Sequence, residues 1–100
     1  MIVKLTEIMR DRSLSENKQC FYAMREVFVN SEHVVCLRED LSFARLLSEG
    51  QLMDGLDPRQ SFTKIYLNRG QSGIDVTVVG SPGVIQETLG LSKQQQLLKG

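Results

Sequence analysis

The chain has 100 residues, of which 41% are hydrophobic, and its 12 basic residues balance its 12 acidic residues. This length and composition are typical of one folded domain with a modest hydrophobic core. The formal net charge of zero argues against strong non-specific binding to nucleic acid, which usually needs a basic surplus.

The sequence contains no segment that we expect to enter a membrane. No apolar run approaches the roughly 18 residues that a membrane-spanning helix needs. Charged residues also interrupt the N-terminal region where a signal peptide would be apolar, at Lys4, Glu7, Arg10 and Asp11. We therefore expect a cytoplasmic protein without membrane insertion, in which Cys20 and Cys36 are reduced and buried.

The first third of the chain predicts two strands. Residues 2–8 fit a period of two, in which alternate side chains lie on opposite faces of the chain. This pattern indicates an opening β-strand. Residues 10–17 are polar and rich in turn formers, although Ser13 and Glu16 also match a capping box for a single helical turn. Residues 20–30 predict the second strand, most clearly near its end.

The middle of the chain predicts a third strand and a short helix. Residues 30–32 form a tight connection, and the apolar run of residues 33–38 suits a strand in the centre of a sheet. Asp40 predicts the start of a helix over residues 41–49, because its carboxylate can accept hydrogen bonds from free amides. The apolar stripe of this helix is Phe43, Leu46 and Leu47. Residues 51–60 predict a loop.

The last third predicts a hairpin and a helix. Residues 62–67 and 74–79 read as strands, because β-branched and aromatic residues recur with a period of two. Residues 68–73 predict a loop longer than a two-residue turn, with glycine in left-handed conformations. The helix spans residues 81–89, with a serine cap, a proline at its first position and a glycine after its end.

These elements predict an α+β fold. We expect a small, mainly antiparallel sheet of four or five strands, a C-terminal helix and one inserted helix, the shorter of the two. The domain spans residues 1–90, and residues 91–100 form a C-terminal tail. The predicted core consists of apolar residues of the strands and the C-terminal helix: Leu5, Val27, Val29, Val35, Leu37, Ile65, Leu67, Val76, Val78 and Ile85.

No combination of residues predicts catalysis, a cofactor site or a metal site. His33 and Cys36 would point to opposite faces of a strand, so with Cys20 they lack the geometry of a zinc site. Residues 70–73, Gly-Gln-Ser-Gly, lack the spacing of a nucleophile motif and predict a hairpin loop. Residues 80–83 predict an ordinary helix cap rather than an anion site. Solvated surface is the expectation for the acidic residues Glu39, Asp40, Asp54 and Asp57.

Several basic and aromatic residues lie on or beside the predicted strands. They are Arg25, Arg38, Lys64 and Arg69, interleaved with Tyr22 and Tyr66. Basic and aromatic side chains on an open sheet can bind single-stranded nucleic acid. The alternative, which we favour at this point, is that the basic residues pair with the equal number of acidic ones.

Three segments resemble the FlbD-type family of small flagellar proteins. They are the opening MIVKLTE, the strand pair EVFVNSEHVVCLRE and the hairpin FTKIYLNRGQSGIDVTVVGSP, which cover roughly half of the chain. The arrangement also resembles the DNA-binding LytTR and RemA-type regulators. The chain departs from the flagellar pattern by extra residues at 10–21, an insertion at 40–61 and its tail. The resemblance implies a small bacterial protein without catalysis and with a role in motility. The alternative is a purely architectural likeness, as in a phage protein of similar topology, to which that role does not apply. In either case the resemblance transfers no site residue.

Taken together, these features predict a non-enzymatic accessory or regulatory protein that acts through protein–protein contacts. The alternative is a small nucleic-acid-binding regulator, and an enzyme ranks third because no acid, base and nucleophile converge in the sequence. We expect a sheet edge or the tail to bind a partner or a second copy, because long open edges seldom stay bare. The apolar residues of the tail are Leu91, Leu97 and Leu98.

Overall fold

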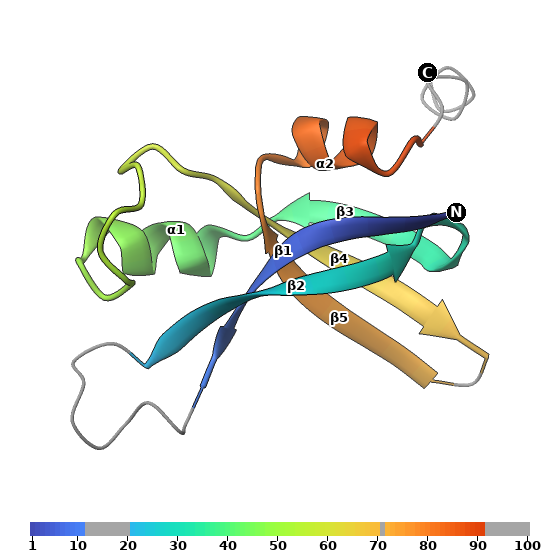
Figure 1. Ribbon diagram of the computed structural model, residues 1–100, viewed down its shortest axis with the longest axis horizontal. Helices are drawn as coiled ribbons and strands as arrows, with labels where there is room; N and C mark the ends of the chain where they lie inside the picture. The colour runs from blue at the N-terminus through green and yellow to red at the C-terminus, as the bar shows by residue number, and fades with distance from the viewer. Residues whose placement is uncertain (12–20, 71, 92–100) are drawn as a thin grey trace.

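The computed structural model describes residues 1–11, 21–70 and 72–91, and gives only the backbone at positions 69 and 72. Within these residues the chain forms a five-stranded antiparallel sheet and two α-helices, which confirms the α+β fold (Figure 1). The elements are β1 (Ile2–Arg10), β2 (Tyr22–Asn30), a single 3-10 turn (Ser31–His33), β3 (Val34–Glu39), α1 (Leu41–Ser48), β4 (Phe62–Arg69), β5 (Ser72–Val79) and α2 (Pro82–Thr88).

The sheet has the strand order β2-β1-β5-β4-β3. Strands β1 and β2 form a hairpin, while β3, β4 and β5 form a meander. The two parts join where Glu7 of β1 lies opposite Val78 of β5. Strand β3 is therefore an edge strand, and the prediction of a central strand at residues 33–38 was wrong. Its apolar run does not mean burial on both faces, because Val34 packs on the core while Val35 is exposed.

The two faces of the sheet are covered differently. On the face that we call inner, apolar side chains of all five strands pack beneath α2 and the residues that follow it. The buried members of this cluster are Leu5, Val29, Ile65, Val78, Ile85 and Leu89. On the opposite, outer face, α1 and the loop after it pack on one end of the sheet, around Ile8, Leu52 and Phe62.

The predicted core is confirmed except at one position. Leu5, Val29, Ile65, Val78 and Ile85 are buried, and Val27, Leu37, Leu67 and Val76 pack against them. Val35 is 64% exposed. The register between β3 and β4 shifts between Val34 and Cys36, so Val35 is the extra residue of a bulge and turns away from the core.

The connection between β4 and β5 is shorter than predicted. The strands continue to pair as far as Arg69 opposite Ser72, which leaves two residues, Gly70 and Gln71, between them. Gly70 has a φ of 63°, a left-handed conformation that glycine adopts without steric cost. Polar residues at the end of this hairpin extend the ladder, so the alternation of apolar residues does not indicate its full length.

The helix signals are confirmed. The side chain of Asp40 caps α1, and Ser81 caps α2 with Pro82 at its first position. Gly90 follows α2 with a φ of 71°. The relative lengths were predicted wrongly, because α1 has 8 residues and α2 has 7. Neither described helix is long and apolar enough to cross a membrane.

Three predictions fall wholly or partly on residues that the structure does not describe. The helical turn at Ser13 and Glu16, the environment of Cys20, and the tail beyond Leu91 belong to this group. Leu91 itself is partly buried and packs against the inner cluster.

Candidate functional site

Large apolar side chains are exposed on the outer face, at the end of the β1–β2 hairpin away from α1. Phe28 on β2 and Ile2 on β1 are 64% and 62% exposed, and Met24 on β2 is 42% exposed. Since Val27 and Val29 pack on the inner cluster, alternation places Met24 and Phe28 on the outer face. We call Ile2, Met24 and Phe28 the apolar patch.

The free edge of β2 lies beside this patch. The amide of Ser31 donates to the Met1 carbonyl at 2.9 Å, and the amide of Asp11 donates to the Phe21 carbonyl at 2.7 Å, so odd-numbered residues hydrogen-bond across the β1–β2 hairpin. The even-numbered residues of β2 therefore turn their N–H and C=O groups to the free edge. Phe28 thus offers an exposed ring and open backbone groups at one place.

The edge formed by β3 is different. Its ladder with β4 is interrupted by the bulge at Val35, and α1 begins two residues after its last residue, Glu39. The amide of Asp40 still donates to the Phe62 carbonyl at 2.8 Å, which holds the end of β3 to β4. Bulges at edges hinder pairing with another chain.

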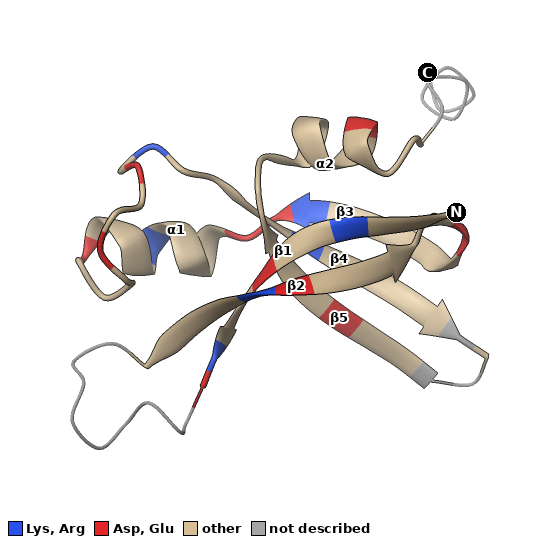
Figure 2. Ribbon diagram, in the orientation of Figure 1, with Lys and Arg blue, Asp and Glu red and all other residues tan. Residues whose placement is uncertain are grey.

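The structure brings together only some of the predicted basic residues. Arg38 lies opposite Lys64, and its guanidinium carbon is 5.5 Å from the ring centroid of Tyr66. Arg25 lies on the inner face, where it pairs with Glu7 at 3.0 Å. The side chain of Arg69 is outside the described atoms. Figure 2 shows basic and acidic residues interspersed along the strands, and the described residues form no basic stripe.

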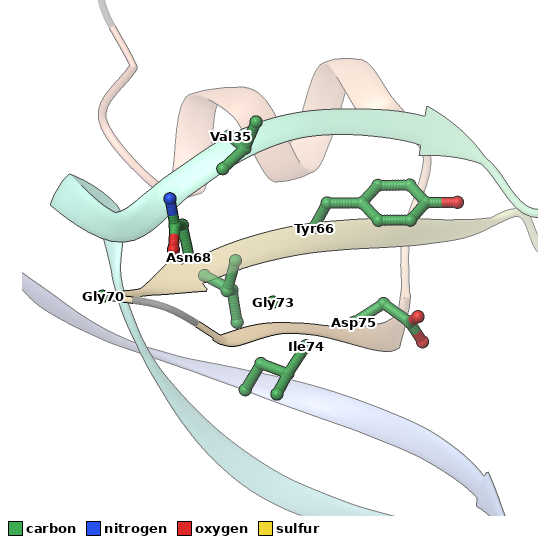
Figure 3. Close-up of a pocket in the computed structure, with 8 residues that line it drawn as sticks. Val35, Tyr66, Asn68, Gly70, Gly73, Ile74 and Asp75 are labelled. Carbon is green, nitrogen blue, oxygen red and sulfur yellow. The ribbon is translucent and has the colours of Figure 1, made fainter.

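The two predicted tyrosines have separate roles. The ring of Tyr22 packs edge-on against Phe43 of α1, with centroids 5.6 Å apart, in the outer cluster. Tyr66 lines a shallow depression on β3, β4 and β5, with a volume of about 500 Å³ (Figure 3). The side chains of Val35, Asn68 and Asp75 also line it. The depression thus brings together the ring of Tyr66, the amide of Asn68 and the carboxylate of Asp75, and the guanidinium of Arg38 lies beside Tyr66.

Asp40 was predicted to lie on the solvated surface, and this prediction was wrong. Its side chain is 5% exposed and joins three elements. One carboxylate oxygen accepts from the amides of Ser42 and Phe43, and the other accepts from the hydroxyl of Thr77 on β5 at 2.8 Å. A residue that caps a helix directly after an edge strand is buried when that helix packs back on the sheet.

The pKa of Asp40 reflects two opposing effects. Burial raises the pKa of this carboxyl. The groups that lower it are the hydrogen bonds from Ser42, from Thr77 and from the Phe43 amide, and the positive charge of Lys64. Their combined effect is larger, so the pKa of Asp40 lies below its ordinary value of 3.8 and the carboxyl is ionised at neutral pH.

The other chemical candidates lie apart. The ring Nδ1 of His33 is 2.9 Å from the Asn68 carbonyl oxygen. Cys36 is an exposed free thiol, so its predicted burial was wrong, because it lies on the outer face of an edge strand. In residues 1–11, 21–70 and 72–91, no group of three His, Cys, Asp or Glu side chains could hold a metal ion.

The remaining acidic and glycine-rich segments have ordinary roles. Glu39, Asp54 and Asp57 are exposed, and Asp57 accepts from the amide of Arg59 at 2.8 Å within a turn. Ser81 accepts from the amide of Val84 at 3.4 Å as a helix cap. Both observations agree with the sequence-based expectation.

No protein-family model, no curated protein and no solved structure matches this chain. The flagellar resemblance therefore depends on the three quoted segments alone.

The sequence-based predictions did not include the apolar patch, although strand alternation indicated it. If Val27 and Val29 face the core, then Phe28 between them faces the other side, and no helix was predicted there.

Proposed function

We propose that this chain is a non-enzymatic accessory or regulatory protein that acts through protein–protein contacts at the outer face of the β1–β2 hairpin. The observation that carries the proposal is Phe28, an aromatic residue exposed on an unbroken edge strand, with Ile2 and Met24 on the same face. Exposed apolar groups beside open backbone groups favour binding of another chain.

The use of the buried polar groups supports a role without catalysis. Three polar residues are buried in the described part of the chain, and each makes a structural hydrogen bond. Asp40 caps α1 and binds Thr77, while the hydroxyl of Thr63 donates to the Gly80 carbonyl at 2.8 Å. Asp40, the residue with the shifted pKa, is thus occupied in holding the fold.

A photo-crosslinking experiment tests the protein-contact function. A photoreactive phenylalanine analogue replaces Phe28 in one variant and Val84 in the control, since Val84 is an exposed apolar residue on α2. After irradiation in the native organism, we expect covalent adducts with one or a few proteins from position 28 only. Equal adduct patterns from both positions, or none from position 28, would contradict the proposal.

A second candidate function, binding of single-stranded nucleic acid, is favoured by one observation. Arg38 and Lys64 lie opposite each other, and Arg38 lies over the ring of Tyr66. Such a cluster can bind a phosphate and stack a base. Asp75 beside Tyr66 and the absence of Arg25 from this face reduce the number of phosphates that can be neutralised.

A titration at low and moderate salt separates the two functions. If single-stranded nucleic acid is the ligand, the double variant Arg38→Ala/Lys64→Ala loses binding and lowers the salt slope by about 0.7 for each lost phosphate contact. The control Arg25→Ala/Arg59→Ala removes the same charge elsewhere and should bind like the original. Sub-micromolar binding that only the first variant loses would replace the protein-contact function.

The tail and the cellular context complete the proposal. We place the protein in the cytoplasm. The flagellar resemblance suggests motility as the process to test first, by deleting the gene for this chain in a flagellated host and measuring swimming.

The tail, with Leu97 and Leu98, is a second candidate contact surface. Because Leu91 packs on the inner cluster, a deletion that tests the tail should remove residues 92–100 and keep Leu91.

A further inference from the structure

We infer that β2 pairs in antiparallel fashion with β2 of a second copy of this chain, about a twofold axis at Phe28. This inference rests on the proposed protein-contact function and names the partner at the apolar patch. The resulting dimer has one continuous sheet across both copies, with the two apolar patches side by side on its outer face.

The first argument is the condition of the two edges. In the described sheet, β2 pairs only with β1, in an unbroken register of nine residue pairs. Its even-numbered residues direct their backbone groups to the free edge, and the strand contains no glycine, proline or bulge. Strand β3 is shorter and bulged. A second strand can therefore add along β2 more readily than along β3.

The second argument is symmetry. A twofold axis normal to the sheet makes the two copies of β2 antiparallel, which continues the pattern of every described strand pair. It also keeps both outer faces on the same side. Because the chain has a formal net charge of zero, two copies do not repel each other through their net charge.

The third argument is the charge pattern, which selects the register. An axis at Arg25 or at Glu26 would place like charges directly opposite each other, which is unfavourable. An axis at Val27 would place Glu26 opposite Phe28 of the second copy. An axis at Met24 would leave the ring of Phe28 outside the paired region. Each of these four registers therefore places a charged side chain opposite a like charge or an apolar ring, or leaves the ring of Phe28 without contact to the second copy.

An axis at Phe28 avoids these conflicts. Phe28 then lies beside its own copy, as an aromatic pair, and Glu26 faces the amide side chain of Asn30 of the second copy. Lys4 lies opposite Phe28 across the hairpin, and Ile2 is the next outer-face residue on β1. The most exposed part of the apolar patch is therefore at the centre of the contact.

The mass of the protein in solution tests the dimer. We expect the wild type to change from dimer to monomer on dilution, measured by size exclusion with light scattering. Phe28→Lys should be a monomer at all concentrations, whereas Val84→Lys, a matched change of an exposed apolar residue, should dimerise like the wild type. Since Phe28 is exposed, both variants should keep the wild-type fold by circular dichroism. A monomeric wild type at the highest attainable concentration would overturn the dimer, as would equal behaviour of the two variants.

Cysteine crosslinking tests the register. In a Cys20→Ser/Cys36→Ser background, Phe28→Cys should form an intermolecular disulfide under mild oxidation, because paired residues of this type are about 5.5 Å apart between Cα atoms. Met24→Cys is the control on the same strand and face, and should crosslink at least tenfold more slowly. Equal rates would overturn the axis at Phe28.

The photo-crosslinking experiment separates this inference from the function on which it rests. A monomeric wild type whose position 28 crosslinks to a different protein overturns the second copy and leaves the protein-contact function standing. A monomeric wild type with no crosslink from position 28 overturns both. A crosslink between two copies, together with the expected masses, supports both.

Discussion

The two edge strands of the sheet, β2 and β3, are stabilised in different ways. Strand β3 has six residues, a bulge and a direct connection to α1, and the buried Asp40 after its end binds α1 and β5. Strand β2 has nine residues, pairs with β1 along its whole length and packs Val29 into the inner cluster, while Arg25 pairs with Glu7. Buried side chains therefore hold both strands, but the β3 edge has a bulge and is followed directly by α1, whereas the β2 edge keeps an open backbone that suits binding.

The largest effect on stability is expected when the side chain of Asp40 is removed. We expect Asp40→Ala to lower the free energy of unfolding by about 2–4 kcal/mol, because it removes a helix cap and leaves the buried hydroxyl of Thr77 without its acceptor. Denaturant unfolding measures the effect. The control Asp54→Ala changes an exposed carboxylate and should stay within about 0.5 kcal/mol of wild type. Similar losses in both variants would mean that β3 is not anchored through Asp40.

The next test concerns Gly80, which connects β5 to α2, the helix that covers the inner face. Its φ is 130°, and a Cβ there would lie 3.0 Å from the Cδ1 atom of Ile85. We expect Gly80→Ala to cost about 1–3 kcal/mol in unfolding free energy, because of backbone strain and this close contact. The matched control is Gly83→Ala, where a Cβ meets nothing within 4 Å. It should be neutral or stabilising. A harmless Gly80→Ala would show that α2 adjusts freely on the sheet.

These features differ in how well the sequence predicts them. The strands, both helix caps and the α2-covered cluster follow from local signals, such as the alternation around Val27 and the Ser-Pro start of α2. The position of β3 at an edge does not follow, because an apolar strand sequence does not specify how many neighbours the strand has. The bulge at Val35 also depends on how β3 aligns with β4, 23 residues further along the chain from Glu39 to Phe62.

The candidate site was the least predictable part. The exposed apolar patch depends on which face α2 covers, and only the assembled sheet shows that Phe28 is exposed. The structure brings together two residues of the predicted basic cluster, Arg38 and Lys64, which lie opposite each other on β3 and β4. Arg25 does not join them, because it lies on the other face of the sheet. The burial of Asp40 depends on Thr77, which is distant in sequence and lies on β5.

Acid should weaken the anchor that Asp40 provides at the end of β3. The pKa of Asp40 in the folded protein lies below the ordinary value of 3.8 that the unfolded chain retains. Its contribution to stability is therefore complete above this ordinary value and is lost as the pH falls through the folded pKa. We expect wild-type unfolding free energy to fall more steeply below about pH 4 than that of Asp40→Asn, by thermal or urea unfolding at several pH values. Parallel pH profiles for the two proteins would contradict this assignment.

The smallest effect is expected for the ion pair on β2. The side chain of Arg25 is 63% exposed and that of Glu7 is 13% exposed, so solvent screens much of their attraction. We expect Arg25→Ala to lower the free energy of unfolding by about 0.5–1 kcal/mol, and the difference from wild type should shrink at about 1 M salt. The control Arg59→Ala removes an arginine that is 91% exposed and 3.6 Å from Asp57, and should change stability less. A loss of more than about 2 kcal/mol for Arg25→Ala would show that β2 depends on a polar side-chain contact. In that case both edge strands would be anchored by a polar contact, as β3 is through Asp40, and this difference between them would disappear.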